Sequence, residues 1–103
     1  MLTIETFIEE HVIIKIEGDI LFLNMLPLSS EIQKYLKETD KDIELDFKNV
    51  DFVDSSAIAL VVKTYRALRE QQRKFYVSNL GGRVYRTFDA IRLLKLLDIQ
   101  EKN

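Results

Sequence analysis

Three consecutive polar residues, Asp54-Ser55-Ser56, join an apolar stretch to the most strongly helical segment of the chain. Asp and Ser are typical helix N-cap residues, because their side-chain oxygens accept hydrogen bonds from backbone N–H groups of the first turn. A serine here also carries a hydroxyl that a kinase can phosphorylate. The positive end of the helix dipole tolerates a phosphoryl group, which adds roughly −1.5 to −2 charges to the surface. The turn therefore predicts either a plain helix cap or a modification site that repels a docked protein.

The segments around this turn predict an α/β fold. An alternating segment and a β-branched segment at the start of the chain are joined by a short polar connection, which indicates an antiparallel hairpin ending at Gly18-Asp19. Later strands alternate with helices and require crossovers, so we expect one mixed sheet with helices packed against it. At this length residues 1–103 form a single domain. Strands are expected at 2–8, 12–17, 43–47 and 74–78, and a helix at 56–71. Gly81-Gly82 opens a second amphipathic segment, whose apolar residues are Val84, Phe88 and Ile91. Residues 93–99 are expected to form a helix end followed by a short strand.

The first predicted helix has two candidate starts. Ser30 and Gln33 have the spacing of a capping box, in which a hydroxyl and an amide each bond a free backbone N–H group. Asn24 is a rival N-cap, and Pro27 would then be tolerated in the first turn. In both cases the helix ends near residue 38, and its apolar face carries Ile32, Tyr35 and Leu36.

An unusually apolar run precedes this helix and consists of Phe22, Leu23, Met25 and Leu26. These side chains cannot all face the core from one helix, so we expect some of them at the surface. An exposed apolar patch beside a functional edge marks a contact with another protein. The run therefore indicates a docking surface, and it leaves open a homodimer formed through that surface.

Composition excludes several kinds of site. The chain has no cysteine, so disulfides and thiolate metal sites are excluded. Its one histidine, His11, has no partners at metal-ligand spacing and is expected in solvent at a hairpin turn. No stretch approaches the ~20 apolar residues of a membrane span, and the start of the sequence has no basic leader. We therefore expect a cytoplasmic protein without a metal, a cofactor or membrane insertion.

Charge is distributed unevenly along the chain. Residues 1–54 carry a net charge of −8 and residues 55–103 a net charge of +6. A basic half can indicate nucleic-acid binding, but no nucleic-acid motif accompanies it. We therefore expect solvated helix faces and no direct contact with nucleic acid. The basic residues in question are Lys63, Arg66, Arg69, Arg73 and Lys74.

Catalysis finds no support in the sequence. There is no Gly-rich phosphate loop, and a nucleophilic Ser55 would need a general base, whereas the one histidine lies at a predicted hairpin tip. A receiver domain would need a cluster of carboxylates after its first strand to bind magnesium, and the opening hairpin lacks one. The sequence therefore predicts a protein that is not an enzyme.

From residue 46 onward the sequence resembles the STAS domain family, and within it the bacterial anti-sigma-factor antagonists. The resemblance rests on Val50 and Phe52, on the Asp54-Ser55-Ser56 turn, and on Phe88-Asp89 at the end of a later helix. The opening hairpin ending in Gly18-Asp19 also matches the start of the family. The resemblance implies the same α/β fold that the segment pattern predicts.

The resemblance further implies a partner switch. Unphosphorylated antagonists of this family bind an anti-sigma factor that is usually also a serine kinase. The kinase phosphorylates the serine directly after the aspartate, and the complex dissociates. At the matching position that serine is Ser55, with Ser56 as the alternative. The expected partner-binding residues are Asp19, Asn24, Asp54, Ser55, Ser56 and Ala57.

Two positions depart from the family pattern. Ala57 stands where the family has a glycine, and Leu21 stands where it usually has an aspartate. The altered exit from the hairpin favours a different partner. The alternative function is therefore a STAS subunit that never switches and serves as an accessory to a lipid or anion transporter, whereas the intact Asp-Ser-Ser turn favours regulation by phosphorylation.

Overall fold

The computed structural model describes residues 2–96 and 99–102. Its elements in chain order are β1 (Thr3–Ile8), β2 (Val12–Glu17), the 3-10 helix η1 (Phe22–Asn24), α1 (Leu26–Glu38), β3 (Ile43–Asn49), α2 (Ser55–Glu70), β4 (Phe75–Ser78), α3 (Gly82–Ala90), α4 (Leu93–Leu96) and β5 (Gln100–Lys102). The strands form one sheet in the order β1-β2-β3-β4-β5. β1 pairs antiparallel with β2, and all other neighbours are parallel. This arrangement confirms the predicted mixed sheet with an opening hairpin.

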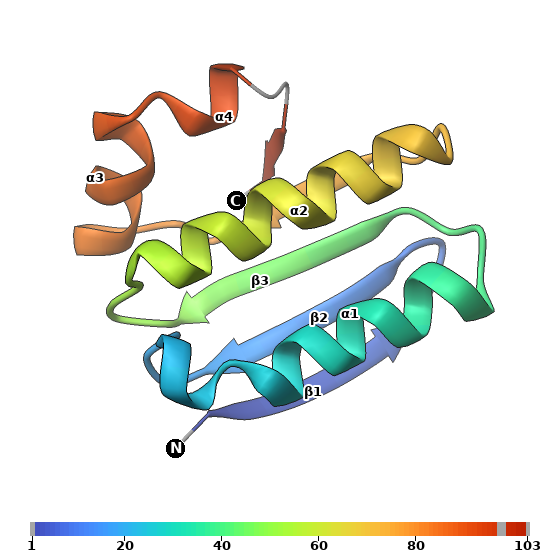
Figure 1. Cartoon of the computed structure of the whole chain (residues 1–103), viewed down its shortest axis with the longest axis horizontal. Coiled ribbons are helices and arrows are strands. Elements are labelled where there is room, and N and C mark those ends of the chain that lie inside the picture. Colours follow the sequence, from blue (N-terminus) through green and yellow to red (C-terminus); the bar gives the residue numbers. More distant parts are fainter. Residues whose placement is uncertain (1, 97–98, 103) are drawn as a thin grey trace.

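One face of the sheet carries the hydrophobic core. Along β2 the side chains of Val12, Ile14 and Ile16 are buried, whereas Lys15 and Glu17 between and after them are exposed. Side chains alternate between the faces of a strand, so only one face of β2 meets the core. Helices α1 and α2 lie next to each other across that face (Figure 1). The apolar residues predicted for the first helix, Ile32, Tyr35 and Leu36, are all buried there.

Helix α3 closes the core beside β3. The Phe88 side chain is fully buried and meets Phe47 edge-on, with ring centroids 5.7 Å apart. Val84 is also buried. Ile91, which the helical spacing predicts for the same face, is 47% exposed, so that prediction is wrong. The reason is that α3 ends at Ala90 and the chain turns away from the helical path at the next residues.

The start of α1 differs from both sequence predictions. The helix begins at Leu26 with Pro27 in its first turn, where the missing N–H group of proline costs little. Ser30 therefore lies inside the helix and is not its N-cap. Asn24 does not cap α1 either, because it belongs to η1, where its Oδ1 accepts a hydrogen bond from the backbone N–H of Leu21 at 2.9 Å.

The sequence predicted a free His11 in solvent, and the structure shows that this prediction is wrong. Its Nε2 lies 2.7 Å from Oε1 of Glu44, and Nζ of Lys102 lies 3.6 Å from the same oxygen. The β1–β2 turn places the imidazole beside the Glu44 side chain of β3. Partial burial acts to raise the pKa of Glu44, but the polar groups of Ser78 and His11 and the charge of Lys102 lower it below its ordinary value.

Arg73 also departs from the sequence prediction, which placed it on a solvated face. It lies in the connection from α2 to β4, and only 7% of the residue is exposed. Its guanidinium donates hydrogen bonds to the backbone carbonyls of Tyr35 (3.1 Å), Leu36 (3.2 Å) and Lys41 (2.7 Å). These carbonyls belong to the last turns of α1 and to the loop after it. Arg73 therefore ties α1 to the end of α2 and has a structural role.

Candidate functional site

The Asp54-Ser55-Ser56 turn lies at the carboxyl end of β3, where α2 begins. Asp54 is the N-cap of α2 and has an extended backbone. Its Oδ1 accepts hydrogen bonds from the backbone N–H groups of Ser56 (2.9 Å) and Ala57 (3.2 Å). Two of the four N–H groups left free by the first helical turn are thus satisfied by one carboxylate oxygen. The aspartate, and not a serine, is the residue that caps this helix.

The second oxygen of Asp54 binds a segment that is distant in the sequence. Oδ2 accepts a hydrogen bond from the backbone N–H of Phe22 at 2.9 Å. The chain after β2 reaches this position because Ile20 pairs in parallel with Val53, and the N–H of Asp54 donates to the carbonyl of Ile20 at 3.2 Å. The β2–α1 and β3–α2 connections consequently meet at one end of the sheet (Figure 1). Asp54 therefore holds η1 against the start of α2.

Asn24 and Asp19, two further predicted residues, belong to the same connection. Asn24 Nδ2 donates a hydrogen bond to the backbone carbonyl of Asp19 at 3.0 Å, while its Oδ1 accepts from Leu21. Asn24 thereby bonds two backbone groups of the loop between β2 and α1 and stabilises the conformation of that loop. The side chain of Asp19 is exposed at the same end of the sheet. The structure thus brings Asp19, Asn24 and Asp54 together at one edge.

The three residues after Asp54 differ in accessibility. Ser55 is the first residue of α2 and is exposed, and Ser56 is half-buried. Ala57 is only 2% exposed and belongs to the core, so its methyl group is not available to a docked protein. In the described part of the chain the Ser55 hydroxyl takes part in no hydrogen bond. Ser55 is therefore the hydroxyl of this turn that is most open to modification.

The electrostatics of the turn favour an ionised Asp54. The hydrogen bond from the Phe22 N–H is the largest influence and lowers the pKa of this carboxyl below its ordinary value, with the N–H groups of Ala57 and Ser56 acting in the same direction. The carboxylate is charged at neutral pH and sits directly before Ser55. Any further negative charge on Ser55 would lie next to an existing one.

The apolar run before α1 divides between core and surface. Met25 packs against the core and Leu28 is buried. Phe22, Leu23 and Leu26 are exposed by 71%, 93% and 75%. The prediction that some of these residues reach the surface is confirmed. The link from this exposed group to Asp54 could not be predicted, because a backbone N–H donor has no sequence signal.

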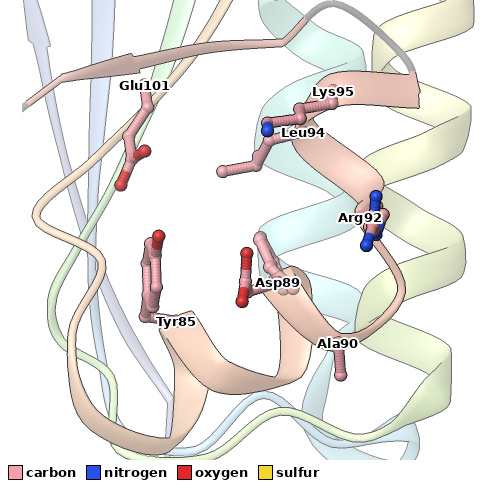
Figure 2. A pocket seen from close by; sticks show the side chains of 8 residues that line it. Tyr85, Asp89, Ala90, Arg92, Leu94, Lys95 and Glu101 are labelled. Atoms are coloured by element: carbon pink, nitrogen blue, oxygen red, sulfur yellow. The ribbon is translucent and has the colours of Figure 1, made fainter.

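A hollow of about 400 Å³ lies elsewhere, between α3, α4 and β5. Figure 2 shows Tyr85, Asp89, Leu94 and Glu101 around it. Two carboxylates and two cations, Arg92 and Lys95, line this hollow, so its charge favours neither an anion nor a cation. Among residues 2–96 and 99–102, no three His, Cys, Asp or Glu side chains gather in a geometry that could hold a metal ion. No helix within those ranges combines the length and apolar character needed to cross a membrane.

A sequence profile of the STAS domain matches residues 4–102. The chain belongs to the STAS domain family. This confirms the resemblance seen in the Asp54 turn and the segments after it. An anti-sigma-B factor antagonist of Staphylococcus epidermidis is 26% identical to this STAS domain over 88 residues, which are 85% of this chain and 82% of the relative.

Solved structures share the fold of this STAS domain. A putative anti-sigma factor antagonist from Thermotoga maritima has a TM-score of 0.86 at 16% identity, covering 97% of this chain and 86% of the other. The phosphorylated form of the Bacillus cell fate determinant SpoIIAA has a TM-score of 0.72 at 18% identity, covering 100% and 92%. A sulfate transporter family protein from Wolinella succinogenes has a TM-score of 0.70 at 16% identity, covering 87% and 74%.

Proposed function

We propose that this STAS domain is an anti-sigma factor antagonist that releases its anti-sigma factor when Ser55 is phosphorylated. The observation that carries the proposal is the exposed Ser55 hydroxyl at the first residue of α2, directly after the ionised cap Asp54. The relatives named anti-sigma-B factor antagonists support the partner class. The shared fold with the phosphorylated form of SpoIIAA is compatible with a phosphoryl group on such a domain.

The geometry of the turn explains how a phosphoryl group can act on a partner without unfolding the domain. Asp54 already satisfies the N–H groups of Ser56 and Ala57, so α2 does not depend on the Ser55 hydroxyl for its cap. The helix dipole offsets part of the added charge within the domain. A protein packed over a neutral Ser55 would instead meet the phosphoryl group and Asp54 together. The charge change is therefore felt mainly at the interface.

The phosphoryl transfer needs no catalytic group from this chain. The γ-phosphoryl group of ATP passes to the Ser55 oxygen, the bond between the β- and γ-phosphates breaks, and ADP leaves with the kinase. The serine proton passes to the kinase or to water. We accordingly propose that this STAS domain is a regulatory protein and not an enzyme, that it acts in the cytoplasm, and that its partner is an anti-sigma factor with serine kinase activity.

Phosphorylation with a cognate anti-sigma kinase and ATP tests the residue assignment. Peptide mass spectrometry should place the phosphoryl group on Ser55, and Ser55→Ala should abolish it. Ser56→Ala is the matched control, because Ser56 is the adjacent, less exposed hydroxyl, and it should keep the labelling. Undiminished labelling of Ser55→Ala would overturn the assignment.

A binding comparison tests the switch itself. The unphosphorylated protein should retain the anti-sigma factor in a pull-down, and Ser55→Asp should lose it because the added carboxylate lies beside Asp54. Ser56→Asp places the same charge at the half-buried neighbour and shows whether the effect depends on position. Equal retention by wild type and Ser55→Asp would contradict the switch.

A second candidate is an accessory subunit of a lipid or anion transporter that binds permanently. The exposed Phe22, Leu23 and Leu26 favour it, since a constitutive contact benefits from an apolar surface. The fold is also found in a sulfate transporter family protein. Stable co-purification with transporter subunits, unaffected by Ser55→Asp, would support this candidate over the switch.

A further inference from the structure

Three side chains of the β2–α1 connection form an exposed apolar patch, which we define as Phe22, Leu23 and Leu26. Leu23 is 93% exposed, and the other two are exposed by more than two thirds. The fold does not need them, because Met25 and Leu28 supply the contacts that this segment makes with the core. Soluble proteins rarely leave such side chains grouped in water unless another molecule covers them. The patch is therefore a candidate contact surface.

Hydrogen bonds anchor the backbone that carries the patch. Phe22 donates its backbone N–H to Asp54 at 2.9 Å, and Asn24 bonds both Leu21 and the carbonyl of Asp19. The backbone under the patch is thus ordered before binding, which limits the entropy lost when a partner binds. It is also linked to the Asp54-Ser55-Ser56 turn, because Asp54 accepts the Phe22 N–H and directly precedes Ser55. A protein that covers Ser55 would therefore also face the patch.

The charges around the patch indicate what covers it. The two segments that build this edge, residues 17–31 and 49–62, carry the carboxylates Glu17, Asp19, Glu31, Asp51 and Asp54 and no Lys, Arg or His. Arg83 of α3 approaches from the side, 5.6 Å from the centre of the Phe52 ring. Anionic lipid headgroups attract basic segments, so an acidic surface of this kind disfavours a membrane. Complementarity favours a protein with basic groups beside an apolar recess.

We propose that the apolar patch selects the anti-sigma partner by entering an apolar recess of that partner. Basic side chains of the partner border the recess where it faces Asp19. This inference rests on the proposed function and adds a second role to the same surface. Ser55 switches the contact, and Phe22, Leu23 and Leu26 decide which anti-sigma factor makes it.

The test measures the affinity of the unphosphorylated protein for its anti-sigma factor by calorimetry. Leu23→Asp should weaken binding by about tenfold or more, as expected for the centre of an interface. Ile91→Asp is the matched control, because it places the same charge on an exposed apolar residue at the end of α3, and it should leave the affinity unchanged. Asp19→Lys should also weaken binding, whereas Glu70→Lys at the other end of α2 should not.

The possible failures can be told apart. If wild type does not bind any anti-sigma factor, the proposed function fails and this inference fails with it. If wild type binds and Leu23→Asp binds equally well, only the role of the patch is overturned. Binding of wild type, but not of Leu23→Asp, to vesicles of anionic phospholipid would overturn it in favour of a membrane. Self-association that Leu23→Asp abolishes in light scattering would overturn it in favour of a second copy of the chain.

Discussion

Replacing Arg73 by methionine should destabilise the domain strongly. Methionine keeps part of the apolar stem but removes the guanidinium that donates to the carbonyls of Tyr35, Leu36 and Lys41. The first two carbonyls lie in the last turns of α1, where carbonyl groups have no partner within the helix. They would remain in a buried region without a donor. The substitution also removes a positive charge from the negative end of the α1 dipole.

The contacts of Arg73 set the size of the effect. A hydrogen bond to a charged group contributes about 1.5–3 kcal/mol, and Arg73 makes three to backbone carbonyls. Methionine loses about as much side-chain entropy as arginine when it is ordered, so the substitution recovers little entropy. Taking the lower value for each of the three bonds gives a loss of about 4.5 kcal/mol. The free energy of unfolding of native proteins is about 5–15 kcal/mol, so this loss is a large fraction of the total stability.

Urea unfolding followed by circular dichroism measures this loss. The midpoint should fall for Arg73→Met while the slope of the unfolding free energy against urea stays unchanged. Lys74→Met is the matched control, because the neighbouring cation is exposed, and it should change stability by less than about 0.5 kcal/mol. Arg73→Lys should fall between the two, since an ammonium cannot serve three carbonyls in fixed directions. If Arg73→Met were as stable as Lys74→Met, the structural role of Arg73 would be refuted.

Two further predictions follow from the cap and the core. The pKa of Asp54 is lowered chiefly by the Phe22 N–H, so its contribution to stability is complete above the ordinary pKa of about 3.9 and is lost as the pH falls through the lower folded-state value. A carboxyl NMR titration should give a midpoint below about 3.9, and a midpoint above it would contradict the hydrogen bond. Phe88→Ala should cost about 3–5 kcal/mol in urea unfolding, because the ring is fully buried against Phe47. Tyr85→Ala, which removes an exposed ring from the same helix, should cost far less.

Patterns carried by neighbouring residues were sufficient to predict most of the fold. Alternation in β2 and the helical spacing of Ile32, Tyr35 and Leu36 each depend on a few adjacent positions, and the structure confirms them. The order of strands and helices then requires crossovers, which make the later strand pairs parallel, and the antiparallel opening hairpin makes the sheet mixed. The predictions for Ile91 and for the start of α1 were wrong, because helix ends depend on the backbone path beyond the periodic segment.

Contacts between distant segments account for the remaining differences. Arg73 sits among basic residues that are exposed, and only the position of α1 turns it inward. His11 likewise meets Glu44 across the sheet, thirty-three positions away. Neither pairing has a sequence signal, because the groups are common and the register that joins them is set by the whole fold. At the candidate site the same limit applies to the bond between Phe22 and Asp54.

The architecture of this edge separates the two tasks proposed for it. Ser55 and Asp54 come from the β3–α2 connection, while the apolar patch comes from the β2–α1 connection. The two connections meet through backbone pairing of Ile20 with Val53 and through the Phe22 N–H, and neither contact depends on the side chain of Phe22, Leu23 or Leu26. Substitutions in the patch can therefore leave the Asp54-Ser55-Ser56 turn undisturbed. The proposed switch and the proposed choice of partner thus rest on separate segments of the chain.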